Sequence, residues 1–293
     1  MRHPIQRGRF AESKLTIVTQ QPAFLYNRVN EQAGRRHYLM GIYDKDPFVR
    51  SMELLRENVP SFAKYPFHLP ALRQLTTLRF HPKVTYIIGE NGMGKSTLLE
   101  AIAVAWGFNP EGGSLNFNFA THESHSELHR HIRLVRGIGK PRDGFFFRAE
   151  TYYNLATNID QLDSEPLGGG RIIDFYGGKS LHEQSHGESF FAAFLHRFGG
   201  NGLYILDEPE AALSPLKQMS MLARIHALVK KNSQFIISTH SPILMGYPDA
   251  LAYYLTPDGI EHINVEETDH YIIMKQFLHN RERMLKELFA DEE

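Results

Sequence analysis

The segment that most constrains this chain runs from Gly89 to Thr97 and fits the pattern G-x-x-x-x-G-K-[ST] at every fixed position. The apolar, β-branched run Val84 to Ile88 precedes it and is typical of a buried parallel strand. Residues 96–105 follow it and carry apolar side chains at helical spacing. The order of strand, glycine-rich loop and helix predicts a phosphate-binding loop rather than an ordinary turn before a helix.

The residue types in this loop suit a nucleoside triphosphate. Glycines let backbone N–H groups close around a β-phosphate, and the helix N-terminus adds the positive end of its dipole. Lys95 is expected to reach the β- and γ-phosphates, and the Ser96 hydroxyl to ligate Mg²⁺. The residues of this predicted site are Gly89, Glu90, Asn91, Gly92, Met93, Gly94, Lys95, Ser96 and Thr97.

Composition excludes several classes of protein. The 293 residues suggest one or two domains. The 33 acidic and 32 basic residues nearly cancel, so net charge does not point to nucleic acid or membrane. The absence of cysteine excludes disulfides, cysteine nucleophiles and thiolate zinc sites. Since no apolar run approaches the roughly 20 residues of a membrane helix, and the first residues lack a signal-peptide pattern, we expect a soluble, cytoplasmic protein without membrane contact.

Residues 1–46 differ in composition from the rest of the chain. Their first 40 positions hold seven Arg or Lys residues against only Glu12 and Glu31. One interpretation is a basic arm that contacts nucleic acid or a protein partner. The other is a loosely attached extension whose charges only solvate it. We favour the extension because the basic residues are dispersed rather than clustered.

Strands and helices alternate through the rest of the chain, which predicts an α/β sheet with the nucleotide at the carboxyl ends of its strands. The predicted elements after the phosphate loop are a strand ending at Asp207, a helix from Ser214 to Lys231, a strand from Gln234 to His240, a hairpin of residues 252–255 and 260–265, and a helix or pair of helices from Tyr271 to Phe289.

Three aromatic residues lie in the proline-bounded segment from Pro60 to Pro70, namely Phe62, Tyr65 and Phe67. Any of them could stack on an adenine. We expect them instead to be core residues of the first sheet.

Acidic and imidazole side chains end two of the predicted strands. Asp207 ends a strand of four apolar residues, where it can hold Mg²⁺ through water. Glu208 can polarise the water that attacks the γ-phosphate, because in-line attack needs a positioned base. His240 closes the next strand and is placed to contact the γ-phosphate. The coincidence of these three residues with a phosphate loop favours a hydrolytic site over separate core roles.

A second small-polar and glycine stretch, Ser185 to Ser189, opens an apolar helix over residues 190–198. Such a helix start is a second anion cradle, although a plain N-capping turn has the same composition. One nucleotide is not expected to need two anion-binding sites from the same chain. The second cradle is therefore expected to contact the nucleotide of another copy, as in a head-to-tail dimer.

The order of phosphate loop, Ser-x-Gly-Glu signature, Leu-Asp-Glu-Pro acids and Ser-Thr-His switch resembles the ABC-type ATPase head. Segments 145–150, 180–189, 207–215 and 238–242 resemble a family of stand-alone bacterial ABC-like ATPases, known as predicted AAA-family ATPases. The resemblance covers about Phe48 to Phe289. It implies an α/β P-loop NTPase fold of ABC-ATPase type: a mixed sheet flanked by helices, an antiparallel β subdomain, and a helical signature subdomain at about residues 150–200. The domain would span residues 47–293, after the extension of residues 1–46.

The resemblance also implies roles for individual residues. Lys95, Ser96 and Asp207 would bind Mg²⁺ and the phosphates of ATP. Glu208 would be the catalytic base, and His240 the sensor of the γ-phosphate. The signature residues that would act in trans are Ser185, Gly187 and Glu188.

Three positions depart from the transporter pattern. His186 and Glu188 replace the usual Gly and Gln of transporter ATPases, which argues against a transporter subunit. Ser214 replaces a common Asp, which puts communication across the dimer in doubt. The strand that usually leads to a Mg²⁺-contacting Gln leads here to Glu150, which we take as a further candidate Mg²⁺ ligand.

These observations predict an ATP hydrolase that dimerises head-to-tail around ATP and gates an unidentified protein partner. About 90 residues separate the phosphate loop from the signature, without sustained heptads, which excludes the coiled-coil arms of SMC- and repair-type ATPases. Two alternatives stay open. One is a nucleotide-gated scaffold with negligible turnover. The other is the ATPase component of a DNA-linked or defence system with a nuclease partner.

Overall fold

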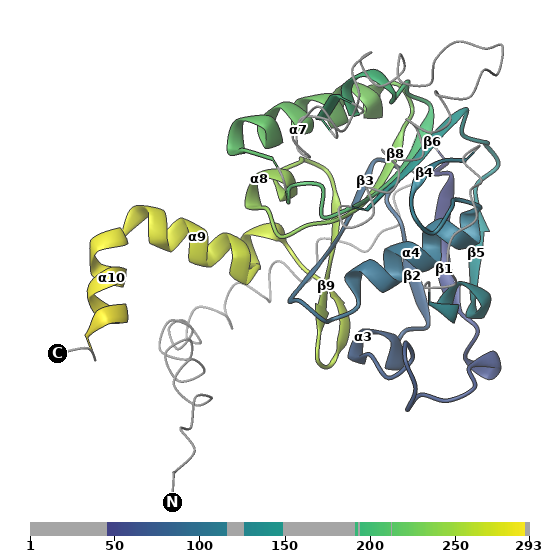
Figure 1. Cartoon of the computed structure of the whole chain (residues 1–293), viewed down its shortest axis with the longest axis horizontal. Helices are drawn as coiled ribbons and strands as arrows, with labels where there is room; N and C mark the ends of the chain where they lie inside the picture. The colour runs from purple at the N-terminus through teal and green to yellow at the C-terminus, as the bar shows by residue number, and fades with distance from the viewer. Residues whose placement is uncertain (1–45, 116–125, 149–190, 193, 212, 291–293) are drawn as a thin grey trace, which may run out of the picture. The chain divides into compact units, whose positions relative to one another are not determined.

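The computed structural model describes residues 46–115, 126–148, 191–192, 194–211 and 213–290. These residues fall into two compact units, residues 46–274 and residues 275–290. The first unit contains two β-sheets and the elements that carry the predicted nucleotide site (Figure 1). Within the described residues, no helix has both the length and the apolar character needed to cross a membrane.

The larger sheet has seven strands in the order β10-β9-β3-β8-β7-β6-β4. Five neighbouring strands are parallel, and the short strands at both edges pair antiparallel. The parallel strands are β3 (Val84–Gly89), β6 (Asp143–Arg148), β7 (Gly202–Asp207), β8 (Gln234–Ser238) and β9 (Leu251–Thr256), and the edge strands are β4 (Gly113–Ser114) and β10 (Gly259–His262). Every residue of β3, β7 and β8 is buried, because helices cover both faces of a parallel sheet.

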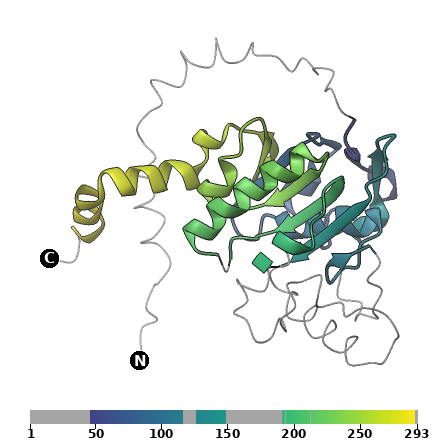
Figure 2. The same ribbon diagram turned by 90° about the horizontal axis from the view of Figure 1, so that it is seen from above.

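Two hydrophobic cores lie on opposite faces of this sheet, and alternate residues of one strand enter different cores. Tyr204 and Leu206 of β7 pack in the core that includes α7 (Pro215–Lys230) and α8 (Pro242–Met245). Leu203 and Ile205 pack in the other core, with α4 (Lys95–Trp106). Figure 2 shows these helices against the sheet from above. The mixed sheet flanked by helices confirms the predicted fold class.

The helix predicted from Ser214 forms as expected. Ser214 is the N-cap of α7, its side chain accepts a hydrogen bond from the Lys217 N–H, and Pro215 occupies the first helical position. A proline at this position loses nothing, because the first N–H groups of a helix have no partner within the helix.

The predicted antiparallel β subdomain is also present, as a three-stranded sheet in the order β2-β1-β5. Its strands are β2 (Thr77–Arg79), β1 (Val49–Leu54) and β5 (Ile132–Arg136), and Met52 in the middle strand lies opposite Leu78 and Leu134. Gln234 of β8 ties it to the larger sheet: its side chain accepts from the Val49 N–H over 2.9 Å and donates to the Val49 carbonyl over 2.8 Å.

Short elements complete the first unit: 3₁₀ turns η1 (Arg56–Asn58), η2 (Glu127–His131) and η5 (Val265–Glu267), and helix α3 (Pro70–Arg73). The predicted terminal hairpin is confirmed by β9 and β10, with Ile260 opposite Leu255. The predicted C-terminal helical region forms two helices, α9 (Asp269–His279) and α10 (Arg281–Phe289). Residues 1–45 of the extension, and most of the predicted signature subdomain, lie outside the described residues.

Candidate functional site

The predicted phosphate loop joins the carboxyl end of β3 to the N-terminus of α4, as its sequence indicated. Gly94 is the N-cap of α4 and has a left-handed backbone, with φ 98°. Gly89 ends β3 with φ 148°, and a Cβ at this position would lie 2.7 Å from the carbonyl oxygen of Leu255 on the neighbouring strand β9. Glycine is therefore required at position 89 by both backbone conformation and strand packing.

Lys95 folds back over this loop. Its Nζ donates to the carbonyl oxygens of Gly89 and Glu90 over 2.9 and 3.1 Å, and it lies 3.8 Å from Glu208 Oε1. The side chain is only 4% exposed. Burial lowers the pKa of the Lys95 ammonium from its usual value, and the nearby carboxylates, with Glu208 first among them, oppose that shift. The loop thus holds a buried cation at the N-terminus of a helix.

Asp207, at the end of β7, faces the first turn of α4. Its Oδ1 accepts hydrogen bonds from Ser96 Oγ over 3.2 Å and from Ser238 Oγ over 2.5 Å. Burial raises the pKa of the Asp207 carboxyl despite both hydrogen bonds. A hydroxyl and a carboxylate are hard oxygen donors, so Ser96 and Asp207 fit a Mg²⁺ ion that is also bound by phosphate oxygens and water.

Glu208 directly follows β7 and has a left-handed backbone, with φ 47°. Its N–H donates to Ser238, to the carbonyl oxygen over 3.1 Å and to the side-chain oxygen over 3.0 Å. A positive φ is uncommon for a residue such as glutamate and is strained there, and such strain clusters at functional sites. The turn places the partly exposed Glu208 carboxylate next to Lys95 rather than in the sheet.

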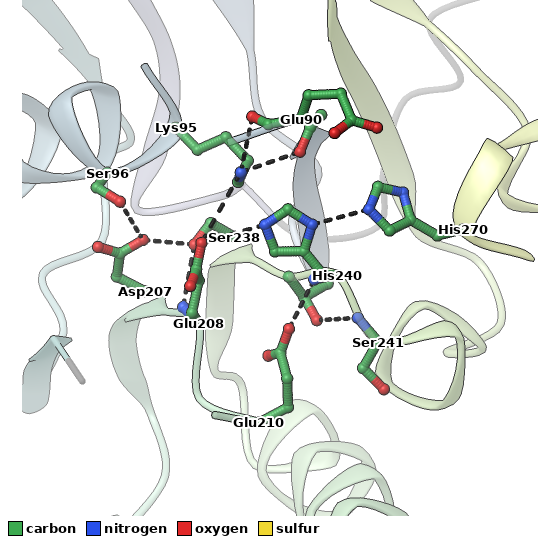
Figure 3. Close-up of polar contacts among 12 residues, drawn as sticks. Glu90, Lys95, Ser96, Asp207, Glu208, Glu210, Ser238, His240, Ser241 and His270 are labelled. Atoms are coloured by element: carbon green, nitrogen blue, oxygen red, sulfur yellow. Dashed lines mark hydrogen bonds and ion pairs between the residues drawn. The ribbon is translucent and has the colours of Figure 1, made fainter. Parts of the chain in front are cut away.

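His240 lies just beyond β8, between the phosphate loop and the end of β7 (Figure 3). Its Nε2 is 3.2 Å from Glu208 Oε1, and its backbone N–H donates to Glu210 Oε1 over 2.6 Å. Its Nδ1 lies 2.8 Å from His270 Nε2 on α9. Burial lowers the pKa of the His240 imidazole, and the positive charge of Lys95 lowers it further, while Glu208 opposes the shift.

The tertiary structure therefore brings five predicted site residues together: Lys95, Ser96, Asp207, Glu208 and His240. They meet because β3, β8 and β7 are adjacent parallel strands whose carboxyl ends lie at one edge of the sheet. The predicted signature residues Ser185, Gly187 and Glu188, and the candidate Mg²⁺ ligand Glu150, lie outside the described residues.

Sequence reasoning missed a buried ion pair behind the loop. Glu100 of α4 contacts Arg148 at the end of β6 over 2.6 Å, and its other oxygen accepts from the Ser126 N–H over 2.8 Å. Arg148 pairs in register with Asp207, and its charge favours the ionised form of that carboxyl. The only signal in the sequence was one acidic residue on an otherwise apolar helix face, next to an Arg that ends a run of phenylalanines.

Sequence reasoning also missed Glu210 and His270 as partners of His240. Glu210 is a half-buried acid whose carboxyl pKa is raised by desolvation, even though it accepts from the His240 N–H. It lies in the same motif as the two predicted site acids, Asp207 and Glu208, so an interpretation of the whole motif could have included it. His270 lies thirty positions after His240, and no local pattern links the two.

The three aromatic residues before the loop have different environments. Phe67 is fully buried and Phe62 packs against the same core, which confirms the prediction for these two. The prediction is wrong for Tyr65, whose side chain is 57% exposed. Its hydroxyl lies 3.2 Å from Thr97 Oγ1, so an exposed aromatic ring stands beside the phosphate loop.

Two family models match overlapping parts of the chain. The family described as "AAA domain" matches residues 57–158. The family described as "AAA domain, putative AbiEii toxin, Type IV TA system" matches residues 121–246. The two matches together include the phosphate loop, the predicted signature, both acids and His240.

Similar curated proteins are ATP-binding proteins of importers. The chain is 24% identical over 216 residues to the phosphate import ATP-binding protein PstB 1 of Streptococcus agalactiae, covering 67% of this chain and 85% of that protein. It is 24% identical over 204 residues to the ribose import ATP-binding protein RbsA of Yersinia pestis, covering 64% of this chain and 38% of that protein.

Similar solved structures include a nucleotide-free ATP-binding cassette from an ABC transporter, with 16% identity and a TM-score of 0.44, covering 81% of this chain and 97% of that one. They also include the SMC head domain from Thermotoga maritima, with 17% identity and a TM-score of 0.37, covering 73% of this chain and 98% of that one.

Proposed function

We propose that this chain, which carries an ABC-type ATPase head, binds ATP with Mg²⁺ and hydrolyses it. The observation that carries the proposal is the meeting of Lys95, Ser96, Asp207, Glu208 and His240 at the carboxyl ends of three adjacent parallel strands. A phosphate loop alone would suit a kinase or a GTPase equally well. A carboxylate and an imidazole beside its lysine favour activation of water at the γ-phosphate.

The residues divide the chemistry of hydrolysis among them. Lys95 neutralises charge on the β- and γ-phosphate oxygens, and the N-terminus of α4 adds the positive end of its dipole. Glu208 orients the attacking water and accepts its proton. His240 donates a hydrogen bond from Nε2 to the γ-phosphate. Mg²⁺, held by Ser96 and Asp207, would neutralise charge on the phosphate oxygens when bound.

We propose that two copies bind ATP head-to-tail, with Ser185, Gly187 and Glu188 of one copy facing the loop of the other. Support comes from the sequence, which holds a second small-polar and glycine stretch before an apolar helix. The proposed output of this cycle is the gating of a protein partner. His186 and Glu188 support a role outside transporters, although the curated relatives named above are importer proteins.

One comparison favours a second candidate function, in defence. The family match over residues 121–246 carries a description that names a toxin of a type IV toxin–antitoxin system. On this alternative, the ATP cycle would control a partner that damages nucleic acid. Its test is DNA binding at low salt that is lost when residues 1–46 are deleted, since contacts to phosphates weaken steeply as salt rises.

The central test is nucleotide binding and turnover by the purified full chain with Mg²⁺. Lys95→Ala is expected to abolish ATP binding, and with it hydrolysis. Lys230→Ala is the matched control, since Lys230 is exposed at the end of α7, away from the loop. Unchanged ATP binding by Lys95→Ala would refute the assignment of the loop. Normal binding with no detectable turnover by wild type would favour the nucleotide-gated scaffold.

A further inference from the structure

We propose that His270 is a positioning residue for His240: it fixes the imidazole tautomer that keeps the Nε2 proton of His240 directed at Glu208 and the nucleotide. The effect of this positioning on turnover rests on the proposed ATP hydrolysis. The hydrogen bond itself does not depend on that function. His270 lies in the first turn of α9, far in sequence from the phosphate loop and from both acids.

The geometry places the two rings in direct contact. His240 Nδ1 and His270 Nε2 are 2.8 Å apart, and the ring centroids are 4.9 Å apart with the planes tilted by 53° (Figure 3). This separation is a hydrogen bond between two nitrogens, so one of them carries a proton and the other does not. A proton on both nitrogens would be repulsive.

The other ring nitrogens decide the direction of this bond. His240 Nε2 lies 3.2 Å from Glu208 Oε1, and an ionised carboxylate oxygen can only accept. A proton on His240 Nε2 meets that oxygen favourably, whereas a lone pair there would face a negative charge. Neutral His240 then has no proton on Nδ1, which accepts from the N–H of His270 Nε2. The structure therefore favours His270 as the donor.

His270 Nδ1 supports the same direction. It is buried and makes no hydrogen bond with any described residue. With His270 as donor, Nδ1 is an unpaired acceptor. In the opposite direction it would be a buried N–H with no acceptor nearby, whereas the proton of His240 Nε2, an atom that also makes no hydrogen bond with a described residue, still faces the Glu208 carboxylate.

The charged groups around His240 fit a neutral ring in this tautomer. The positive charge of Lys95 disfavours a second proton on the His240 ring. Glu208 faces Nε2 of that ring, and Glu210 accepts a hydrogen bond from the backbone N–H of His240. Glu210 thus fixes where the main chain of His240 lies, and His270 fixes how the ring presents its proton. A hydrogen bond to the far nitrogen sets the tautomer of an imidazole in the same way at other sites.

The direct test uses imidazole NMR spectra of the full chain, labelled with isotope in histidine and free of nucleotide. His240→Gln identifies the His240 signals. We expect wild type to show His240 protonated at Nε2, with a coupling between His240 Nδ1 and His270 Nε2 across the hydrogen bond. A His240 proton on Nδ1, or no such coupling, would overturn the proposal. This test needs no catalytic activity and no variant of His270.

Variants then connect the tautomer to turnover. His270→Phe keeps a ring but loses the donor, whereas His270→Gln restores an N–H donor near the Nε2 position. We expect His270→Phe to give mixed tautomers of His240 and to lower kcat about 5-fold, the effect of losing one hydrogen bond, with KM for ATP little changed. His270→Gln should recover most of kcat and the wild-type tautomer.

The matched control is His279→Phe on the same helix. His279 is exposed, and its ring contacts the carbonyl oxygen of Lys275, one turn earlier in α9, as its only hydrogen bond within the described residues. It should change neither the tautomer nor kcat. If His270→Phe leaves both unchanged while its melting temperature stays at the wild-type value, the proposal is wrong. If wild type shows the coupling but no ATP turnover, the proposed function fails and the positioning role stands.

Discussion

Ser96 Oγ donates a hydrogen bond to Asp207 Oδ1 over 3.2 Å, although the two residues are 111 positions apart in the sequence. The bond joins the first turn of α4 to the end of β7 and gathers two hard oxygen donors beside the phosphate loop. Two segments that separately match phosphate-binding and acidic motifs thus form one site through the order of strands in the sheet.

Replacing Asp207 by asparagine should lower kcat/KM for ATP and raise the melting temperature of the nucleotide-free protein. We expect Asp207→Asn to lower kcat/KM for ATP with Mg²⁺ by about 100-fold, the typical effect of removing one charge-stabilising group. Burial raises the pKa of Asp207 in the folded state above its value of 3.8, so the ionised carboxylate destabilises the fold at neutral pH. The nucleotide-free variant should therefore melt at a higher temperature than wild type at neutral pH.

The control for this experiment is Asp258→Asn, in the exposed turn between β9 and β10, which should change neither quantity. Thermal melting without nucleotide and steady-state kinetics across Mg²⁺ concentrations measure the two effects. A lower melting temperature for Asp207→Asn would contradict the desolvation argument.

Glu208→Gln should separate binding from chemistry. The amide keeps the size of the side chain but cannot accept a proton from water, so we expect kcat to fall about 100-fold or more while ATP binding is retained. Slow hydrolysis should also let ATP-bound dimers accumulate, which analytical ultracentrifugation with and without ATP detects. Glu261→Gln, on the exposed edge strand β10, is the control. Hydrolysis by Glu208→Gln at the wild-type rate would mean that another group activates the water.

Gly89→Ala should damage the fold more than Gly92→Ala does. Both glycines have positive φ, but a Cβ at Gly89 meets the Leu255 backbone at 2.7 Å, whereas a Cβ at Gly92 has nothing within 4 Å. We expect Gly89→Ala to lose about 1–3 kcal/mol more of the free energy of unfolding, since β3 and β9 must separate to accept the methyl group. Urea denaturation of both variants measures this difference, and equal losses would show that the backbone conformation alone matters.

Acidification should destabilise the protein through His81. This residue is buried, and desolvation lowers the pKa of its imidazole below 6.5 despite the nearby Asp249. The unfolded chain therefore binds a proton as the pH falls below about 6.5, before the native state does, so stability declines over that range.

His81→Asn should reduce this decline. The asparagine oxygen can replace Nδ1 as acceptor for the Lys83 N–H. We expect the free energy of unfolding of wild type to fall more than that of the variant between about pH 7.5 and about pH 5.5, by no more than about 1.4 kcal/mol per pH unit for one group. Urea titrations at the two pH values measure it, with His262→Asn on β10 as an exposed control. Parallel declines in wild type and His81→Asn would exclude His81 as the source.

The sequence alone determined the class of fold and most of the predicted nucleotide site. Largely apolar segments that lead to Gly89, Asp207 and His240 favour a parallel sheet with helices on both faces, and such sheets gather polar residues at the carboxyl ends of their strands. The start of α7 could also be predicted, because Ser214 and Pro215 act on the helix that they begin. These sequence patterns are either confined to a few neighbouring residues or repeat with the period of a single helix or strand.

Only the tertiary structure decided which distant groups support these residues. Glu100 meets Arg148, and His270 meets His240, because packing brings α4 against β6 and the start of α9 against the end of β8. A single polar residue on an apolar helix gives no sign of its partner, since any buried charge or ring nitrogen could satisfy it. Tyr65 is an example of the opposite kind. Its aromatic ring led to a prediction of burial, whereas the fold leaves it exposed beside Thr97.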